Sequence, residues 1–343
     1  MDQESGIQEE QNGQNERDSI MDNKQVYKAT LCFSIRRALW DLVALLGFAA
    51  LCAAGFYIMD KTTDKGLIGL AIGAVVGLVV LIIFLRWISY KYKAGQIAMM
   101  TRGVTEGELP QDVLAEGARV VKERFTTVAA FFAVTGVIKG IFNQLGRGIT
   151  AAGQAIGGDT GGTIGNAVSS VIQVIVSYLC DCCLGWVFFR KDVKSSKATL
   201  EGAVLFFKHG KTLVKNLGRV FGIGLASLIA IGGAFTGIFY LVASRFPVFF
   251  DRLYTEIMES AARNSTTIPS WLNSPAILTI VAAVIGGIIV WSVIHSVFIR
   301  PFVLIGVLRN YIQSGIEDMP TEESFVLLDS KSSKFKKLHA EAA

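Results

Sequence analysis

The chain has 343 residues, of which 52% are hydrophobic and only 18% are charged, and its formal net charge is +5. Soluble domains are usually about one quarter charged, so this composition excludes an ordinary soluble domain and favours an integral membrane protein. The positive charge is distributed between long apolar runs, so it does not indicate a nucleic-acid-binding surface.

The first segment, residues 1–24, is polar, as Gln8-Glu9-Glu10-Gln11 illustrates. It lacks the apolar stretch of a cleavable signal peptide. A segment of this kind buries too little apolar surface to offset the entropy lost on ordering. We therefore expect a disordered N-terminal tail.

Long apolar segments follow, and a bilayer core of about 30 Å requires about 20 helical residues. The third segment contains Lys139, so its alternative interpretation is a buried or surface-lying helix. The predicted spans are residues 41–59, 66–85, 126–145, 168–189, 220–243 and 276–298.

The distribution of Lys and Arg predicts the orientation of these spans. If the N-terminus is cytoplasmic, most of the 33 basic residues fall in inside segments, namely 1–40, 86–125, 190–219 and 299–343. We expect a protein of the plasma membrane, or of an inner membrane, with both termini in the cytoplasm.

Two short motifs indicate internal repetition. Lys28-Ala29-Thr30-Leu31 recurs as Lys197-Ala198-Thr199-Leu200, and Glu116-Gly117-Ala118 recurs as Glu201-Gly202-Ala203. Aligning them predicts an all-α fold of three tandem units, each an amphipathic helix followed by a transmembrane hairpin. The units cover residues 25–111, 112–196 and 197–312, and a cytoplasmic C-terminal tail covers 313–343. Because each unit holds one pair of spans, the repeats are parallel, which suggests a pseudo-threefold bundle.

Each unit begins with apolar residues at helical spacing beside cations, such as Leu200, Val204 and Phe207 in the third. One interpretation is an interfacial helix whose cations bind anionic headgroups, and the other is a cytoplasmic helix packed on the span ends. The candidate membrane-surface cations are Arg36, Arg37, Lys208, Lys211 and Lys215.

Glycines spaced four residues apart favour close helix packing in lipid, either within the chain or in a homo-oligomer. The candidates are Gly69, Gly73 and Gly77 in the second span and Gly233 and Gly237 in the fifth. A further glycine-rich segment, 146–166, favours a loop or a partly helical cap, and a glycine-faced helix is the alternative.

Asp181 is the main candidate for chemistry, because it lies about 13 Å from the cytoplasmic end of the fourth predicted span. A carboxylate at that depth must pair, face the bundle interior or stay protonated. His295 in the sixth span is a second candidate, and together they could relay protons or bind a cation. The alternative is a polar contact that fixes helix packing.

Cys180, Cys182 and Cys183 flank Asp181. Their spacing places them on different helix faces, so no metal site is predicted. No nucleotide-binding loop, catalytic serine motif or cofactor motif is found, so neither an enzyme nor a cofactor is expected.

The stretch from Cys182 to Gly237, with its cysteines, basic helix and glycine-containing span, resembles the later spans of choline transporter-like proteins. The resemblance covers a small part of the chain and assigns no residue a role. The sequence favours a transporter or channel for a small solute or ion, with Asp181 and His295 near the pathway. The alternative is a non-transporting membrane scaffold or lipid-organising protein that acts through basic amphipathic helices.

Overall fold

A computed structural model describes residues 21–63, 66–157, 161–263, 267 and 269–342. Nearly all of the predicted N-terminal tail lies outside this range. Every regular element in the described part of the chain is helical. The long helices are α2 (Asn23–Thr63), α3 (Gly66–Ile88), α6 (Val128–Gly157), α7 (Gly161–Phe189), α8 (Ser195–Ser227), α11 (Pro275–Ile294) and α12 (Arg300–Glu317). The shorter ones are α4 (Ala94–Thr105), α5 (Val113–Arg124), α9 (Gly233–Ala243), α10 (Pro247–Arg263), α13 (Glu322–Asp329) and α14 (Ser333–Ala342), with π-helical turns η1 (Ser89–Lys93), η3 (Leu228–Gly232) and η4 (His295–Ile299).

The chain forms two compact units. The first comprises residues 1–217 and 301–343, and the second comprises residues 218–300. This division differs from the three tandem units expected from the sequence motifs, and the tandem-repeat arrangement is not confirmed.

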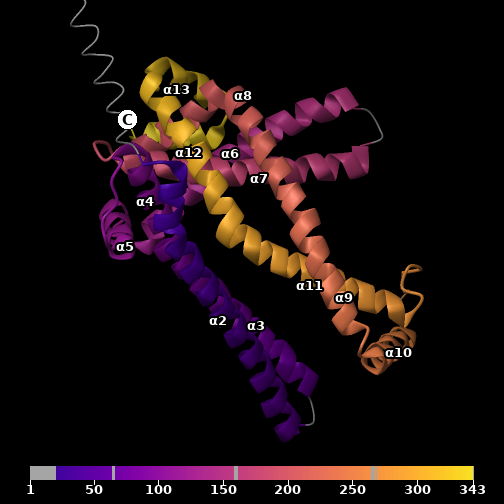
Figure 1. Cartoon of the computed structure of the whole chain (residues 1–343). Helices are drawn as coiled ribbons and strands as arrows, with labels where there is room; N and C mark the ends of the chain where they lie inside the picture. The colour runs from indigo at the N-terminus through magenta and orange to yellow at the C-terminus, as the bar shows by residue number, and fades with distance from the viewer. Residues whose placement is uncertain (1–20, 64–65, 158–160, 264–266, 268, 343) are drawn as a thin grey trace, which may run out of the picture. The chain divides into compact units, whose positions relative to one another are not determined.

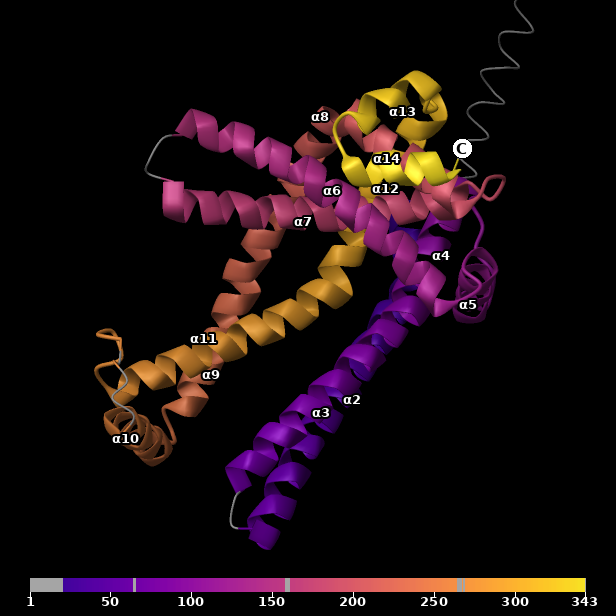
Figure 2. The same cartoon turned by 180° about the vertical axis from the view of Figure 1, so that it is seen from behind.

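In the first unit, α2 and α3 form an antiparallel hairpin whose helices lie side by side along their length (Figures 1 and 2). Small residues permit this contact, because lipid supplies no hydrophobic drive for helix association and close backbone approach must replace it. A Cβ on Gly69 would lie 2.0 Å from the carbonyl oxygen of Gly55, and one on Gly73 would lie 2.5 Å from that of Leu51. A Cβ on Gly77 would meet the ring of Phe48 at 2.9 Å.

The outward side chains of this hairpin are apolar and exposed, among them Leu46, Tyr57, Val75 and Ile83. In the most apolar stretch of α2, only 6% of the residues are buried. In the most apolar stretch of the helix Ile68–Thr105, 17% are buried. A large contiguous apolar surface of this kind requires lipid or a partner.

We call the other packed helices of the first unit, α4–α7, the part of α8 up to Leu217, and α12–α14, the helical head. Its core is made of large side chains with almost no exposure, such as Met100, Trp186 and Tyr311. Gly185 of α7 contacts Leu308 of α12, and Gly315 of α12 contacts Trp186. Apolar burial of this density is what holds a packed helical domain together.

The C-terminal hairpin α13–α14 packs on α6 and α8. Phe325, Leu328 and Phe335 form one buried cluster with Ile141 of α6 and with three residues of α8, Leu200, Ala203 and Val204. Gln144 of α6 bonds to the start of α14, accepting from the Ser332 hydroxyl at 2.6 Å and from the Lys334 backbone N–H at 3.2 Å. The apolar face of residues 137–144 therefore contacts protein.

The glycine-rich segment 146–166 was expected as a loop or partial cap, and this expectation is wrong for its described residues. They belong to α6 up to Gly157 and to α7 from Gly161, and the two helices lie side by side (Figure 2). A four-residue glycine period is close to the helical repeat, so it places glycine on one helix face rather than breaking the helix.

The second unit is a hairpin of the C-terminal part of α8, η3 and α9 against α11, with α10 between them in sequence. A Cβ on Gly287 would lie 2.1 Å from the Thr236 hydroxyl oxygen and 2.7 Å from the Gly232 carbonyl oxygen, so Gly287 meets Gly232 and Thr236 in the close contact. The predicted packing glycines Gly233 and Gly237 face open space within 4 Å. Glycine spacing alone does not show which face of a helix meets its neighbour, and here the contacting face carries Gly232 and Thr236.

Four helices in the described part of the chain are long and apolar enough to cross a membrane: Asn23–Thr63, Ile68–Thr105, Gly222–Ala243 and Pro275–Glu317. They overlap most or all of the first, second, fifth and sixth predicted spans, and they indicate a multi-pass membrane protein. Six spans are not confirmed. The third predicted span is found only as part of a bent pair with α5, and the described apolar part of the fourth, Val176–Phe189, is shorter than a span.

Candidate functional site

Asp181 lies inside the helical head, near the C-terminal end of α7. Its side chain is 4% exposed, and one carboxylate oxygen lies 2.6 Å from the ammonium of Lys93. Lys93 ends η1, and its side chain is 32% exposed, so it reaches from the surface to the buried carboxylate. The contact is a salt bridge between α7 and the segment that leads into α4.

The side chains next to Asp181 in sequence are part of the head core. Cys182 and Cys183 have no exposed surface, and the Cys183 thiol donates to the Thr199 carbonyl at 3.7 Å. Tyr311 of α12 donates its hydroxyl to the Gly202 carbonyl. Among the described residues there is no group of three His, Cys, Asp or Glu side chains that could hold a metal ion.

His295 belongs to the second unit, where it begins η4. Its ring is tilted against that of Trp291, with centroids 5.1 Å apart. The Trp291 indole N–H donates to the Ser227 hydroxyl at 3.0 Å. Asp181 and His295 therefore have different surroundings in separate units, and each has partners within its own unit.

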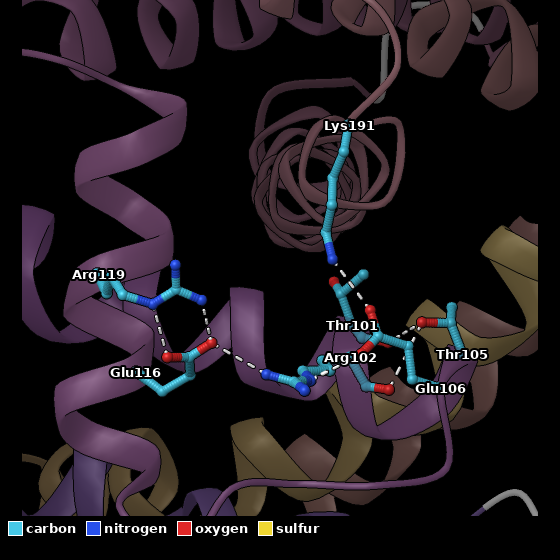
Figure 3. Close-up of polar contacts among 7 residues, drawn as sticks. All are labelled: Thr101, Arg102, Thr105, Glu106, Glu116, Arg119 and Lys191. Atoms are coloured by element: carbon cyan, nitrogen blue, oxygen red, sulfur yellow. Dashed lines mark hydrogen bonds and ion pairs between the residues drawn. The ribbon is translucent and has the colours of Figure 1, made fainter.

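An ion-pair network lies at the junction of α4, α5 and the end of α7 (Figure 3). Arg102 joins two carboxylates, with its Nε 2.7 Å from Glu106 and its Nη1 3.0 Å from Glu116. Glu116 also accepts two bonds from Arg119, at 2.8 Å and 2.6 Å. Lys191 completes the network with a contact of 3.0 Å to Glu106.

Local sequence sets up this network. Gly107 has a φ of 73°, which lets the chain turn directly after α4. Asp112 then caps α5 by accepting from the backbone N–H groups of Leu114 and Ala115 at 3.1 Å and 3.0 Å. The cap fixes where α5 begins, and so places Glu116 opposite Arg102.

The network lines a cavity of about 650 Å³, which also contacts Arg124 and Phe188. Hydrogen bonds from Arg119, the nearer and stronger influence, and from Arg102 hold the pKa of Glu116 below its usual range. The hydroxyl of Thr101 donates to the Gly185 carbonyl at 3.4 Å, and that of Thr105 donates to the Thr101 carbonyl at 2.9 Å. The glutamates that line this cavity each pair with a cation, and the hydroxyls of Thr101 and Thr105 each donate to a backbone carbonyl. These contacts are typical of an ion-pair network that holds helices together.

The repeated motif Glu-Gly-Ala has similar surroundings in its two copies. Glu201 on α8 lies 3.0 Å from Arg190, which directly follows α7, as Glu116 on α5 pairs with Arg102 near the end of α4. Glu201 also accepts from the Trp186 indole at 3.1 Å, and burial raises its pKa. In both copies the glutamate forms a salt bridge to an arginine at the end of the preceding helix, α4 for Glu116 and α7 for Glu201.

The candidate membrane-surface cations occupy different environments. Arg36 is exposed and Arg37 is half-buried on α2, immediately before its apolar part. Lys208 on α8 lies 2.5 Å from Asp318. Lys211 and Lys215 lie in α8, and their side chains are outside the described part of the chain. The apolar residues Leu200 and Val204 are buried by protein, as a helix packed within the head requires.

Aromatic and basic residues surround the base of the α2–α3 hairpin, and we call them the basic–aromatic belt. Arg36 and Arg37 were predicted from the sequence as membrane-surface cations, whereas the other members were not. The Trp40 indole donates to the Tyr92 hydroxyl at 3.1 Å, and the Trp40 ring lies 5.9 Å from that of Phe84. The ammonium of Lys91 lies 5.3 Å from the Trp87 ring centre. The belt comprises Arg36, Arg37, Trp40, Phe84, Arg86, Trp87, Lys91 and Tyr92. The clustering of tryptophan, tyrosine and cations at the end of apolar runs is the signal that could have revealed it.

Comparison with protein-family models, with curated proteins and with solved structures finds no match to this chain.

Proposed function

We propose that this protein is a non-transporting membrane scaffold. Two transmembrane hairpins anchor the helical head at the cytoplasmic surface, and the basic–aromatic belt gathers anionic lipid. The observation that carries the proposal is the salt bridge of Asp181 with Lys93, because it gives the sequence's best candidate for a transport pathway a structural partner.

A carboxylate that conducts protons or cations must exchange them with water during the transport cycle. Asp181 is 3% exposed, and its neighbours Cys182 and Leu179 are at most 1% exposed. An ammonium lies 2.6 Å from the carboxylate and neutralises it. These surroundings favour the alternative interpretation of Asp181, a polar contact that fixes helix packing.

The environment of α6 supports a four-span arrangement. The charged C-terminal hairpin covers α6 at Ile141 and Gln144, near the end of the third predicted span, and the Lys334 side chain contacts Gly140. A covered, charged surface is incompatible with contact to lipid tails. Beyond Gln144, α6 continues only to Gly157, which is about 20 Å of helix against a bilayer core of about 30 Å. We therefore place α6 and α7 in the head.

The belt supports lipid binding at the membrane surface. Tryptophan and tyrosine prefer the headgroup level, and basic residues there attract anionic lipid by about 1 kcal/mol each. The indole N–H of Trp40 and the ammonium of Lys91 both meet Tyr92, so the belt is held together by contacts between the two helix ends. An ordered set of cations is better suited to concentrating anionic lipid than flexible cations are.

The test compares two pairs of adjacent basic residues: Arg36 and the half-buried Arg37 in the belt, and the exposed Lys336 and Lys337 on α14. Full-length protein is reconstituted in vesicles of phosphatidylcholine and phosphatidylserine, extracted with its surrounding lipid, and analysed for lipid composition. We expect phosphatidylserine to be enriched around the wild type. Arg36→Gln with Arg37→Gln should weaken the preference by up to about thirtyfold, whereas Lys336→Gln with Lys337→Gln should preserve it.

The same vesicles test transport, through proton flux with an entrapped pH dye and through potassium conductance. We expect both to equal those of protein-free vesicles, and Asp181→Asn to change neither. Flux that the wild type supports and Asp181→Asn abolishes would overturn the proposal in favour of a transporter. Equal lipid preference in the two double variants would remove the role of the belt.

A further inference from the structure

The second unit contains two adjoining cavities where α9 ends and α11 begins. The first, of about 410 Å³, is lined entirely by apolar residues, including Phe239, Phe246 and Ala282. The second, of about 230 Å³, is lined partly by polar residues, including Ser244, Asp251 and Thr279. Ala243 and Phe250 line both cavities, so the two cavities lie next to each other.

The position of these cavities at the ends of two candidate spans makes them accessible to lipids. α9 closes one candidate span at Ala243, and α11 opens the next at Pro275, so the cavities lie at a membrane surface. α10 connects these ends of the hairpin (Figure 1). Phe246, Val248 and Phe249 are each at least 60% exposed, which is typical of residues that enter the acyl boundary. The apolar cavity is therefore open to lipid chains, and the polar one lies beside it.

Most polar groups that line the polar cavity are acceptors, and the Tyr240 hydroxyl is the side chain there that can also donate. The Ser244 hydroxyl donates to the Leu241 carbonyl at 2.9 Å, and the Thr279 hydroxyl donates to the Pro275 carbonyl at 3.4 Å. Both hydroxyls have used their proton and offer only acceptor lone pairs. The Asp251 carboxylate accepts and, when ionised, carries negative charge. A ligand group that fits these three residues must donate hydrogen bonds, and a positive charge on it would be favoured.

We propose that these two cavities form a binding site for a long-chain amine, an amphiphile with a single alkyl chain and an ammonium head. The chain occupies the apolar cavity, where each buried methylene contributes about 0.8 kcal/mol. The ammonium lies among Asp251, Ser244 and Thr279, which satisfy its three donors. A carboxylate or phosphate head is disfavoured, because it would face acceptors and a like charge. The combined cavities lie within the size range of ordinary small-molecule sites.

The experiment uses full-length protein in phosphatidylcholine nanodiscs and a photoreactive octadecylamine with a diazirine in its chain. We expect saturable labelling of peptides from α9, α10 and α11. Unlabelled octadecylamine should compete at least tenfold more effectively than stearate, which has the same chain length and the opposite charge. Asp251→Asn should reduce this preference severalfold while labelling of the apolar cavity persists.

A matched pair of variants separates the site from general lipid contact. Ala282→Leu fills the apolar cavity and should reduce labelling at least tenfold. Ala234→Leu makes the same change on the same hairpin at an exposed position outside both cavities, and should leave labelling intact. Equal competition by stearate, or labelling that Ala282→Leu does not reduce, would overturn the proposal. Its outcome is independent of the lipid preference of the belt in the first unit.

Discussion

Replacement of Lys93 by methionine is the sharpest perturbation of the helical head. Methionine keeps the length and apolar stem of lysine but removes the ammonium that lies 2.6 Å from Asp181. Removing one partner of a buried ion pair typically costs about 3–5 kcal/mol, because it leaves a buried charge without its counter-charge. Lys93 is 32% exposed, so water already weakens the pair, and we expect about 2–3 kcal/mol.

The reverse change is expected to be milder. In Asp181→Asn, the ammonium of Lys93 can turn to water, so the expected loss is about 1 kcal/mol. The double variant Lys93→Met with Asp181→Leu removes both charges and should recover at least half of the loss caused by Lys93→Met.

Thermal unfolding in a mild detergent, followed by tryptophan fluorescence, measures these differences. For a unit of this size, 2–3 kcal/mol corresponds to a fall in melting temperature of roughly 5–10 °C. If Asp181 instead lined a hydrated pathway, water would solvate the carboxylate and Lys93→Met would be nearly silent. A melting temperature for Lys93→Met equal to that of the wild type would refute the reasoning.

Three further predictions concern packing, the C-terminal hairpin and pH. Gly69→Ala should lower the melting temperature of the full chain measurably, because its Cβ would lie 2.0 Å from the Gly55 carbonyl oxygen. Gly237→Ala is the control, because its Cβ would meet open space, and it should leave the melting temperature unchanged. Equal effects of the two substitutions would contradict the assigned contact. Gln144→Ala removes the bonds from Ser332 and Lys334, so amide hydrogen exchange in residues 321–342 should accelerate severalfold while exchange in α4 stays constant. Because the folded pKa of Glu116 is held below its ordinary value of 4.5, its contribution to stability is present above that value and is lost as the pH falls through the lower, folded pKa. Glu116→Gln should therefore flatten the decline of melting temperature on acidification below about pH 5, and an unchanged pH profile would argue against the ion-pair network.

Four of the six predicted spans coincide with helices that could cross a membrane, since continuous apolar runs identify a span without further information. The third and fourth predicted spans do not coincide with such helices, and the reason is the same for both. A helix face that packs against protein has the same composition as one that contacts lipid. Ile141 is covered by α13–α14 and Leu179 by the head, and only tertiary structure reveals this.

At the candidate site, too, the sequence predicted the local feature but not its tertiary contact. The position of Asp181 in an apolar run indicated a buried carboxylate, and the structure describes one. Its partner Lys93 could not be found, because the two residues belong to helices far apart in sequence. The glycine spacing located the α2–α3 contact at Gly69 and Gly73. It did not locate the contact at Gly232, because the spacing of Gly233 and Gly237 does not show which face of α9 meets α11.

The location of the tip of the α6–α7 hairpin tests the four-span arrangement most directly. In a chain whose native cysteines are replaced, single cysteines at Ala151, Gln111 and Thr62 are labelled with a membrane-impermeant maleimide from each side of sealed vesicles. Gln111 marks the side of the head, and Thr62 marks the opposite end of the α2–α3 hairpin. The four-span arrangement predicts that Ala151→Cys is labelled from the same side as Gln111→Cys. Labelling of Ala151→Cys together with Thr62→Cys would mean that α6 and α7 cross the membrane, and would contradict the account.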